Sequence, residues 1–319
     1  MSFFIRKLLY IGGMLFLISL ISFIAIHAAP NSFFSAGELN PNITKESIEH
    51  LKAIYGLDKP LWEQYLRWVW AMLHLDFGLS FASGKSVMSE ISARLPITLT
   101  MNLIAMLFVF WTALYLGIRS ALNQHTWIDK AIKQLSLLSF ALPSFYLALL
   151  LILFLGLGLG WFPISGLESM EPKEGIAQWL DRAWHMTLPI FVMVFGGIGG
   201  LTMYIRSLTL EILKSDYIFF AKARGIDEKM IRKRLILPNL MPSIITILGL
   251  SLPGLIGGSV IIESIFSING MGLLFYQSAL SRDYPVIMGI LMITAFLTLL
   301  GNVLADVALW KLNPYAKRG

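Results

Sequence analysis

The sequence predicts an all-α polytopic membrane protein with six transmembrane helices. Hydrophobic residues make up 56% of the 319 residues and charged residues only 14%, whereas about 25% of the residues in a soluble domain are charged. Six apolar stretches reach the roughly 20 residues that a helix needs to cross a bilayer. They run from about Leu8 to Ala29, Ile97 to Gly117, Leu135 to Leu159, Leu188 to Ile205, Ile244 to Ile262 and Val286 to Trp310.

The distribution of Lys and Arg predicts an N-in, C-in orientation. With the N-terminus inside, 16 of the 25 basic residues and five acidic residues fall in cytoplasmic segments. The external segments then carry nine basic and twelve acidic residues. Cytoplasmic loops are the ones enriched in Lys and Arg, so the net charge of +6 reflects these loops and indicates a lipid bilayer, not a nucleic acid, as the partner.

The N-terminal region, residues 1–96, is expected to hold the first crossing and an external helical segment. The first apolar stretch exceeds the roughly 7 to 15 residues of a signal-peptide core, so we expect an anchor. Apolar spacing then predicts helices from Thr44 to Tyr55 and from Pro60 to Leu75. The second helix has Leu61, Tyr65, Val69 and Met72 on one face. Residues 97–310 are the predicted five-helix core, and 311–319 a cytoplasmic tail.

Several local patterns argue against a metal site, a nucleotide site and an enzyme active site. The chain has no cysteine, and its five histidines show no pair four residues apart, so no metal site is predicted. The GKS tripeptide beginning at Gly84 lacks the glycine five residues earlier that a phosphate-binding loop requires. We find no catalytic triad or carboxylate pair and expect no enzyme. Glycine runs, LGLGLG at 155–160 and GGIGG at 196–200, predict close helix packing.

Candidates for a translocation path or gate come from position alone. Glu263 lies at the outer end of the fifth predicted crossing, and carboxylates within a bilayer are costly and commonly functional. Asn269 and Met271 follow in the next external loop. We take these three residues as the path candidates.

A basic stretch, AKARGIDEKMIRKRLILPN, separates the fourth and fifth crossings. We expect Ser215 to cap a short helix that stops at Gly225, where a left-handed residue ends helices most easily. Asp227 is expected to cap a second helix that reaches Pro238. Binding of the basic residues to anionic lipid is one interpretation. It leaves an apolar group without a role, and this group predicts a partner surface: Ile218, Phe219, Phe220 and Ala221.

The spacing of this stretch resembles the coupling loop of ABC importer permeases. That pattern is EAA, three residues, Gly, nine residues, then I-x-L-P, and here Ala221, Gly225 and Leu237-Pro238 occupy its positions. Phe219 and Phe220 stand in place of Glu and Ala, as in the peptide/nickel branch, whose DYxxxARxxG pattern resembles the run from Asp216 to Gly225. Segments along nearly the whole chain are similar to that branch: YGLDKPLWEQYLRW, HLDFGLS, RLPITL, LPSFYLALLL, HMTLP, GGSVIIESIFSINGMGLL and RDYPVIMG.

The resemblance implies the type I ABC importer permease fold, in the bacterial inner membrane. It implies a coupling loop at about 207–241 and these contact residues for an ATPase: Asp216, Tyr217, Ala221, Ala223, Gly225, Leu237 and Pro238. The implied partners are a second permease subunit, commonly a homologous sister chain, two ABC ATPase subunits and an extracytoplasmic substrate-binding protein. This chain would bind no cofactor, because ATP and Mg belong to the ATPases.

The segment WVWAMLHLDFGLSFASGKSV most resembles nickel-import permeases. The expected substrate is therefore nickel, carried as a small chelate, and dipeptide or oligopeptide import is the alternative. A self-sufficient ion-coupled carrier is a third interpretation. The scarcity of charged groups within the crossings counts against it.

Overall fold

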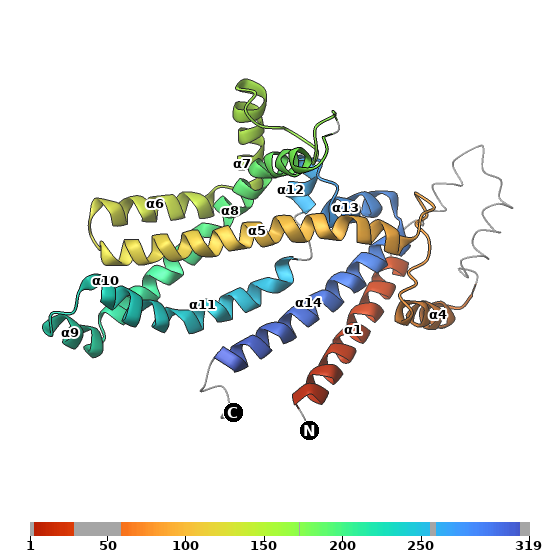
Figure 1. The fold of residues 1–319 in the computed structure, drawn as a ribbon. Coiled ribbons are helices and arrows are strands. Elements are labelled where there is room, and N and C mark those ends of the chain that lie inside the picture. The colour runs from red at the N-terminus through yellow and green to blue at the C-terminus, as the bar shows by residue number, and fades with distance from the viewer. Residues whose placement is uncertain (1–2, 29–58, 172, 256–259, 313–319) are drawn as a thin grey trace. The chain divides into compact units, whose positions relative to one another are not determined.

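The computed structural model describes residues 3–28, 59–171, 173–255 and 260–312, and these residues are mostly helical (Figure 1). Contacts divide the chain into two units. The first unit comprises residues 1–98, 256–260 and 269–300, and the second comprises 99–255, 261–268 and 301–319. The division predicted at residues 96 and 97 stays a prediction; the contacts also bring residues 269–300 into the N-terminal unit.

Four described helices are long and apolar enough to cross a membrane: Val87–Leu122, Ile176–Leu213, Glu228–Ser251 and Tyr284–Leu304. A bent pair of helices would make a fifth crossing, and α1 (Phe3–Ala28) contains a shorter apolar stretch, Leu9–Ala25. The structure therefore has the helices of a polytopic membrane protein. Six crossings remain the prediction that adds α1 and the bent pair to these four.

The helix α8 (Ile176–Leu213) is central to the second unit, where α6 (Trp127–Ala141) packs along it. The GGIGG run makes this packing close. A Cβ at Gly199 would lie 2.5 Å from the Ser136 carbonyl oxygen of α6, and one at Gly197 would lie 2.8 Å from the Val109 side chain of α5 (Val87–Leu122). The packing predicted for this glycine run is confirmed.

The third predicted crossing is not a single straight helix. α6 ends at Ala141, and the next helix is α7 (Ser144–Leu151), continued by the π-helical η1 (Ile152–Gly158). The two parts are bent by 98°. Pro143 causes the break, because the residue before a proline avoids the helical region, and Leu142 is extended with φ −84° and ψ 116°.

The fifth crossing begins earlier than predicted. α10 (Glu228–Ile231), the π-helical η2 (Arg232–Ile236) and α11 (Leu237–Ser251) form one continuous helical run. Pro238 was expected to stop the second short helix, since proline clashes with the carbonyl four residues earlier. The wider π turn directly before it provides the space. A 3₁₀ turn, η3 (Leu252–Leu255), follows α11.

The first unit packs α1 and α4 (Leu61–Leu73) with the start of α5, α13 (Met271–Ser281) and the first part of α14 (Tyr284–Leu312). α4 confirms the helix predicted from Pro60, although Leu61 is exposed and Trp68 lies on the packed face. The helix predicted at Thr44 to Tyr55 lies outside the described residues. The core of this unit consists of Phe77, Val87, Ile91, Met271, Leu274, Val286, Ile290 and Met292.

Two sequence motifs meet in the first unit. The buried carboxylate of Asp283, from RDYP, accepts a hydrogen bond from Ser80 Oγ at 2.5 Å. It also accepts hydrogen bonds from the backbone N–H groups of Phe81 at 3.0 Å and Ala82 at 3.1 Å. The loop after α4, which includes the GKS tripeptide, is therefore tied to the turn between α13 and α14. Gly84 allows the loop after α4 to turn, with φ +68°.

Candidate functional site

An elbow, residues 215–231, joins α8 to the fifth crossing. Its first helix is α9 (Asp216–Ala223), and Gly225 follows with φ +73°. The N–H of Gly225 donates to Lys222 O at 2.9 Å, and the N–H of Ile226 donates to Ala221 O at 3.1 Å. This pair of bonds is a Schellman motif, which closes the helix end. The predicted stop at Gly225 is confirmed.

The two helix starts of the elbow differ from each other. Asp227 accepts the N–H of Lys229 at 3.1 Å and caps α10, as predicted. Ser215 stands at the start of α9, but its hydroxyl donates to Ile212 O at 2.5 Å instead of capping α9. The backbone carbonyl of Ser215 accepts the N–H groups of Ile218 and Phe219. The position of this start was predicted correctly, and the role of the Ser215 side chain was wrong.

The apolar group on α9 divides between two faces. Ile218 and Ala221 are 0% and 6% exposed and join a core cluster with Ile205 of α8. Phe219 and Phe220 are 68% and 61% exposed and point away from that cluster. The predicted partner surface is therefore confined to the two phenylalanines. The same cluster includes residues of α5, α10, η2 and α11: Ala113, Ile118, Ile231, Ile236, Leu240 and Ile244.

The other coupling candidates with side chains lie in α9 or at the start of α11. Asp216, Tyr217 and Ala223 are exposed, Leu237 is half-buried, and Pro238 is exposed in the first turn of α11. The cations of the elbow and of η2 are also exposed: Lys222, Arg224, Lys229, Arg232, Lys233 and Arg234. The elbow thus presents two exposed aromatic side chains on a segment rich in exposed Lys and Arg side chains.

A buried carboxylate, not singled out from the sequence, braces the helices beneath the elbow. Asp129 of α6 is fully buried and accepts two hydrogen bonds from Arg206 of α8, at 2.8 and 3.0 Å. Ser120 Oγ of α5 donates to it at 2.6 Å, and Lys133 lies 3.2 Å away. Arg206 directly follows Ile205, which contacts the elbow core. The sequence did offer a signal for this brace, because Asp129 is an acidic residue in a loop whose other charged residues are basic.

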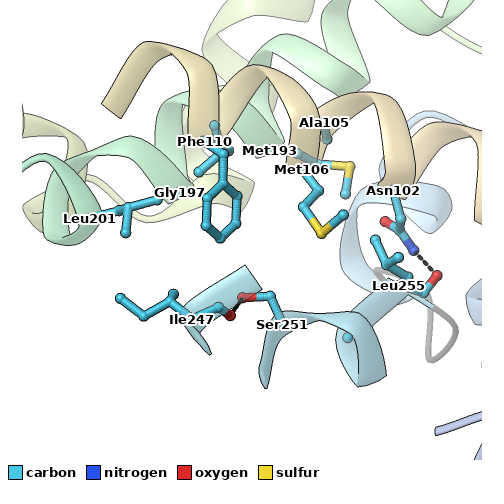
Figure 2. Close-up of a pocket in the computed structure, with 12 residues that line it drawn as sticks. Asn102, Ala105, Met106, Phe110, Met193, Gly197, Leu201, Ile247, Ser251 and Leu255 are labelled. Carbon is cyan, nitrogen blue, oxygen red and sulfur yellow. Dashed lines mark hydrogen bonds between the residues drawn. The ribbon is translucent and has the colours of Figure 1, made fainter. Parts of the chain in front are cut away.

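An open pocket of about 340 Å³, which we call the chamber, lies within the second unit, between α5, α8, α11 and η3. Figure 2 shows Met106 and Phe110 pointing from α5 into the space toward α11. The buried Asn102 side chain donates a hydrogen bond to Leu255 O at 2.7 Å. This bond gives a partner to a backbone carbonyl in the 3₁₀ turn that follows α11. The remaining lining residues are Ala105, Val109, Met193, Gly197, Leu201, Ile247, Ser251 and Gly254.

The three path candidates lie outside this lining. Glu263 is fully buried in α12 (Val260–Ile265). Asn269 accepts a hydrogen bond from Arg94 Nε at 2.9 Å, and the N–H of the buried Met271 donates to Thr98 Oγ1 at 2.8 Å. Asn269 and Met271 belong to the first unit, and Glu263 belongs to the second. None of the three is among the residues that line the chamber, and the sequence pattern marked no lining residue as part of a path.

Family profiles match most of the chain. The profile described as the binding-protein-dependent transport system inner membrane component matches residues 113–317, and the profile for the N-terminal part of such membrane components matches residues 1–102. The helices and these matches define a polytopic protein of the bacterial inner membrane. The chain belongs to the family of binding-protein-dependent transport system inner membrane components.

Curated relatives align with nearly the whole chain. The oligopeptide transport system permease protein AppB of Bacillus subtilis is 38% identical over 307 residues, 96% of each chain. The dipeptide permease DppB of Lactococcus lactis is 33% identical, over 92% of this chain and 91% of the relative. The oligopeptide permease OppB of Haemophilus influenzae is 31% identical over 98% of each. These relatives support the peptide branch of the resemblance and give no support to its nickel part.

A solved structure shares the fold. An inward-facing structure of the MetNI methionine ABC transporter has a chain that matches with a TM-score of 0.53 and 17% identity. The match covers 71% of this chain and 97% of the other. The predicted ABC importer permease fold is confirmed.

Proposed function

We propose that this permease subunit carries short peptides across the inner membrane. The three relatives reported above are named for oligopeptides or dipeptides, and they align almost end to end with this chain. The chamber adds chemical support. Its thioether, aromatic and aliphatic side chains can adapt to side chains of varied shape, and Asn102 and Ser251 add two polar groups. Peptide import therefore replaces nickel as the main interpretation.

We further propose that the elbow is the docking element for the ATPase. Two ATPase subunits would bind ATP and Mg, a sister permease would pair with this chain, and a binding protein would deliver the peptide. Exposed aromatic side chains are common binding hot spots, and Phe219 and Phe220 are the exposed pair on a helix whose other face is packed. This division of α9 into a packed face and an exposed aromatic face is the observation that carries the proposal.

The packing of the second unit supplies a route from the elbow to the chamber. Ile218 and Ala221 belong to the same cluster as Ile236 and Leu240 at the start of the fifth crossing. Further along the same helical run, Ile247 and Ser251 line the chamber. A displacement of α9 by the ATPase would thus move a chamber wall. Coupling of this kind requires that both sites bias the same two-state element.

Reconstitution with the binding protein and ATPases tests both proposals. ATP-driven uptake of a labelled dipeptide or tripeptide is expected, without competition from nickel. The double change Phe219→Ala with Phe220→Ala should reduce uptake at least about tenfold, since a hot-spot loss near 2 kcal/mol exceeds the 1.4 kcal/mol that corresponds to tenfold. Its matched control is Trp127→Ala, an exposed aromatic residue on α6 of the same unit.

The alternatives give different results in this assay. Labelled nickel uptake without peptide uptake would restore the nickel interpretation. Uptake that persists without ATP and stops with a protonophore would indicate a self-sufficient carrier. Normal uptake by the double phenylalanine variant would remove the docking role of the elbow and leave the substrate assignment intact.

A further inference from the structure

The short helix α4 has two apolar faces, and the described residues of its own unit cover only one. Tyr65, Trp68 and Met72 pack toward α1 and the core of the first unit. On the adjacent side, Trp62, Leu66, Trp70 and Leu73 are 66%, 57%, 67% and 69% exposed. At 3.6 residues per turn these four lie along one stripe, which we call the outer stripe.

Specific contacts hold α4 against the C-terminal half of α1 (Figure 1). Tyr65 Oη lies 2.8 Å from Ser19 Oγ, and its ring centroid lies 5.3 Å from that of Phe23. Gln64 Oε1 lies 3.2 Å from His27 Nε2. These contacts, from Ser19 to His27, place α4 beside the last turns of an apolar helix.

The neighbouring surface of α1 is itself suited to lipid. Leu17, Ile21 and Ile24 are more than half exposed and lie on one face of α1, at the same level as the α4 contacts. Such a face is suited to contact with acyl chains. The outer stripe of α4 thus lies on a helix packed beside a second exposed apolar face of the same unit.

The polar residues of α4 lie together on the remaining side. Arg67 forms an ion pair with Glu63 at 2.7 Å, and Gln64 follows Glu63 along this strip. A narrow polar strip opposite a broad apolar arc is the pattern of helices that lie in the plane of a membrane interface. Tryptophan also favours this boundary, because its ring has an apolar body and a polar N–H.

We propose that α4 is an interfacial helix that inserts Trp62, Leu66, Trp70 and Leu73 into the leaflet beside the C-terminal half of α1. The Glu63–Arg67 strip faces the water at the lipid headgroups. The binding partner of the outer stripe is thus the bilayer and not another subunit. This role does not depend on which substrate the permease carries.

Site-directed spin labelling tests the proposal in the assembled transporter. The chain has no cysteine, so Leu66→Cys on the outer stripe and its neighbour Arg67→Cys on the polar strip each give one label in this subunit. The transporter is placed in nanodiscs of phosphatidylethanolamine and phosphatidylglycerol, with cysteine-free versions of the partner subunits. Collision rates are measured with oxygen, which concentrates in lipid, and with chromium oxalate, which stays in water.

The expected result is a ratio of oxygen to chromium oxalate collisions several-fold higher at position 66 than at position 67. A low ratio at both positions would place the outer stripe in water and overturn the proposal. Exclusion of both reagents at position 66 would show that a protein surface covers the stripe, which would also overturn it.

Unlabelled protein provides a second measurement. Lipids brominated near the headgroup end of the acyl chain should quench tryptophan fluorescence less in Trp62→Phe and Trp70→Phe than in the parent protein. Trp68→Phe, which changes the packed face, is the matched control and should alter this quenching least. Indistinguishable quenching in the parent and the outer-stripe variants would contradict the insertion of α4.

Discussion

The helices α9 and α4 both pack one apolar face within their own unit and expose aromatic residues on another, yet they are built differently. The inner face of α9 is buried in a core cluster, and the Schellman motif at Gly225 closes its end. None of the residues of α4, all of which the structure describes, is buried. Around α9 the exposed charges are mainly cations, whereas the two charged residues of α4, Glu63 and Arg67, form one ion pair.

This difference separates two kinds of surface helix. A helix that passes movement from a partner to its own core needs a fixed inner face, and α9 has one. A helix that lies in a membrane interface needs only a broad apolar arc and a polar strip, and α4 has those. The four predictions below test this contrast, in order of decreasing expected effect.

The largest effect is expected at the brace beneath α9. Asp129→Ala leaves the Arg206 guanidinium without its buried partner, and breaking a buried ion pair costs about 3–5 kcal/mol. The thermal unfolding midpoint of the purified protein should fall, and hydrogen exchange should increase in α9. Lys133→Ala removes only the partially exposed partner and should cost about 1 kcal/mol or less. Equal losses in the two variants would show that the Asp129–Arg206 pair is not the brace.

The inner face of α9 should be the next most sensitive. Ile218→Ala removes a fully buried side chain, and such truncations cost about 2–5 kcal/mol. Ala221→Asp, which introduces a charge at the same face, should act likewise. Phe219→Ala should leave the unfolding midpoint of the isolated chain almost unchanged, because this side chain is exposed. A fall in midpoint for Phe219→Ala as large as that for Ile218→Ala would contradict the two-faced description of α9.

The closing turn of α9 should show a smaller effect. Gly225→Ala forces a residue with a Cβ into the left-handed region, at a cost of about 1–2 kcal/mol. A Cβ there would meet no described atom within 4 Å, so the cost comes from the backbone alone. Gly200→Ala in α8 is the matched control, because its Cβ also has open space but its backbone is helical. Gly200→Ala should be neutral or stabilising. If it lowered the unfolding midpoint as much as Gly225→Ala, backbone strain at Gly225 would not be the cause of the loss.

The smallest effect is expected on α4. Tyr65→Phe removes the hydroxyl that pairs with Ser19, and a single hydrogen bond contributes about 0.5–1.5 kcal/mol. The unfolding midpoint should fall slightly. Trp62→Phe, on the outer stripe, should leave it unchanged in detergent. A larger loss for Trp62→Phe would mean that the outer stripe packs on protein.

Sequence reasoning predicted the elbow better than the chamber, for a physical reason. A helix stop at glycine and a cap at aspartate are local, so Gly225 and Asp227 could be identified from their neighbours. The chamber combines Asn102, Met193 and Ile247, which lie on three helices far apart in sequence. No local pattern links these residues, and the path candidates chosen from position lie elsewhere.

The helix boundaries show the same limit. The apolar content of Leu135 to Leu159 predicted a crossing, but the 98° bend at Pro143 divides this stretch into two helices. Pro238 predicted a helix end, but a π turn carries the helix past it. In both cases the proline was visible in the sequence. Whether the proline ended the helix depended on the backbone geometry around it, which hydropathy does not report.

By itself, the sequence determined that this is a polytopic helical membrane protein and that its basic stretch contains a glycine-stopped elbow, because hydropathy and helix caps are properties of neighbouring residues. Only the tertiary structure decided which faces of the short helices are covered. It assigned Ile218 to the core and Phe219 to the surface, and it left Trp62 exposed beside the packed Tyr65. Those assignments depend on contacts between segments distant in the chain, which the order of residues alone does not specify.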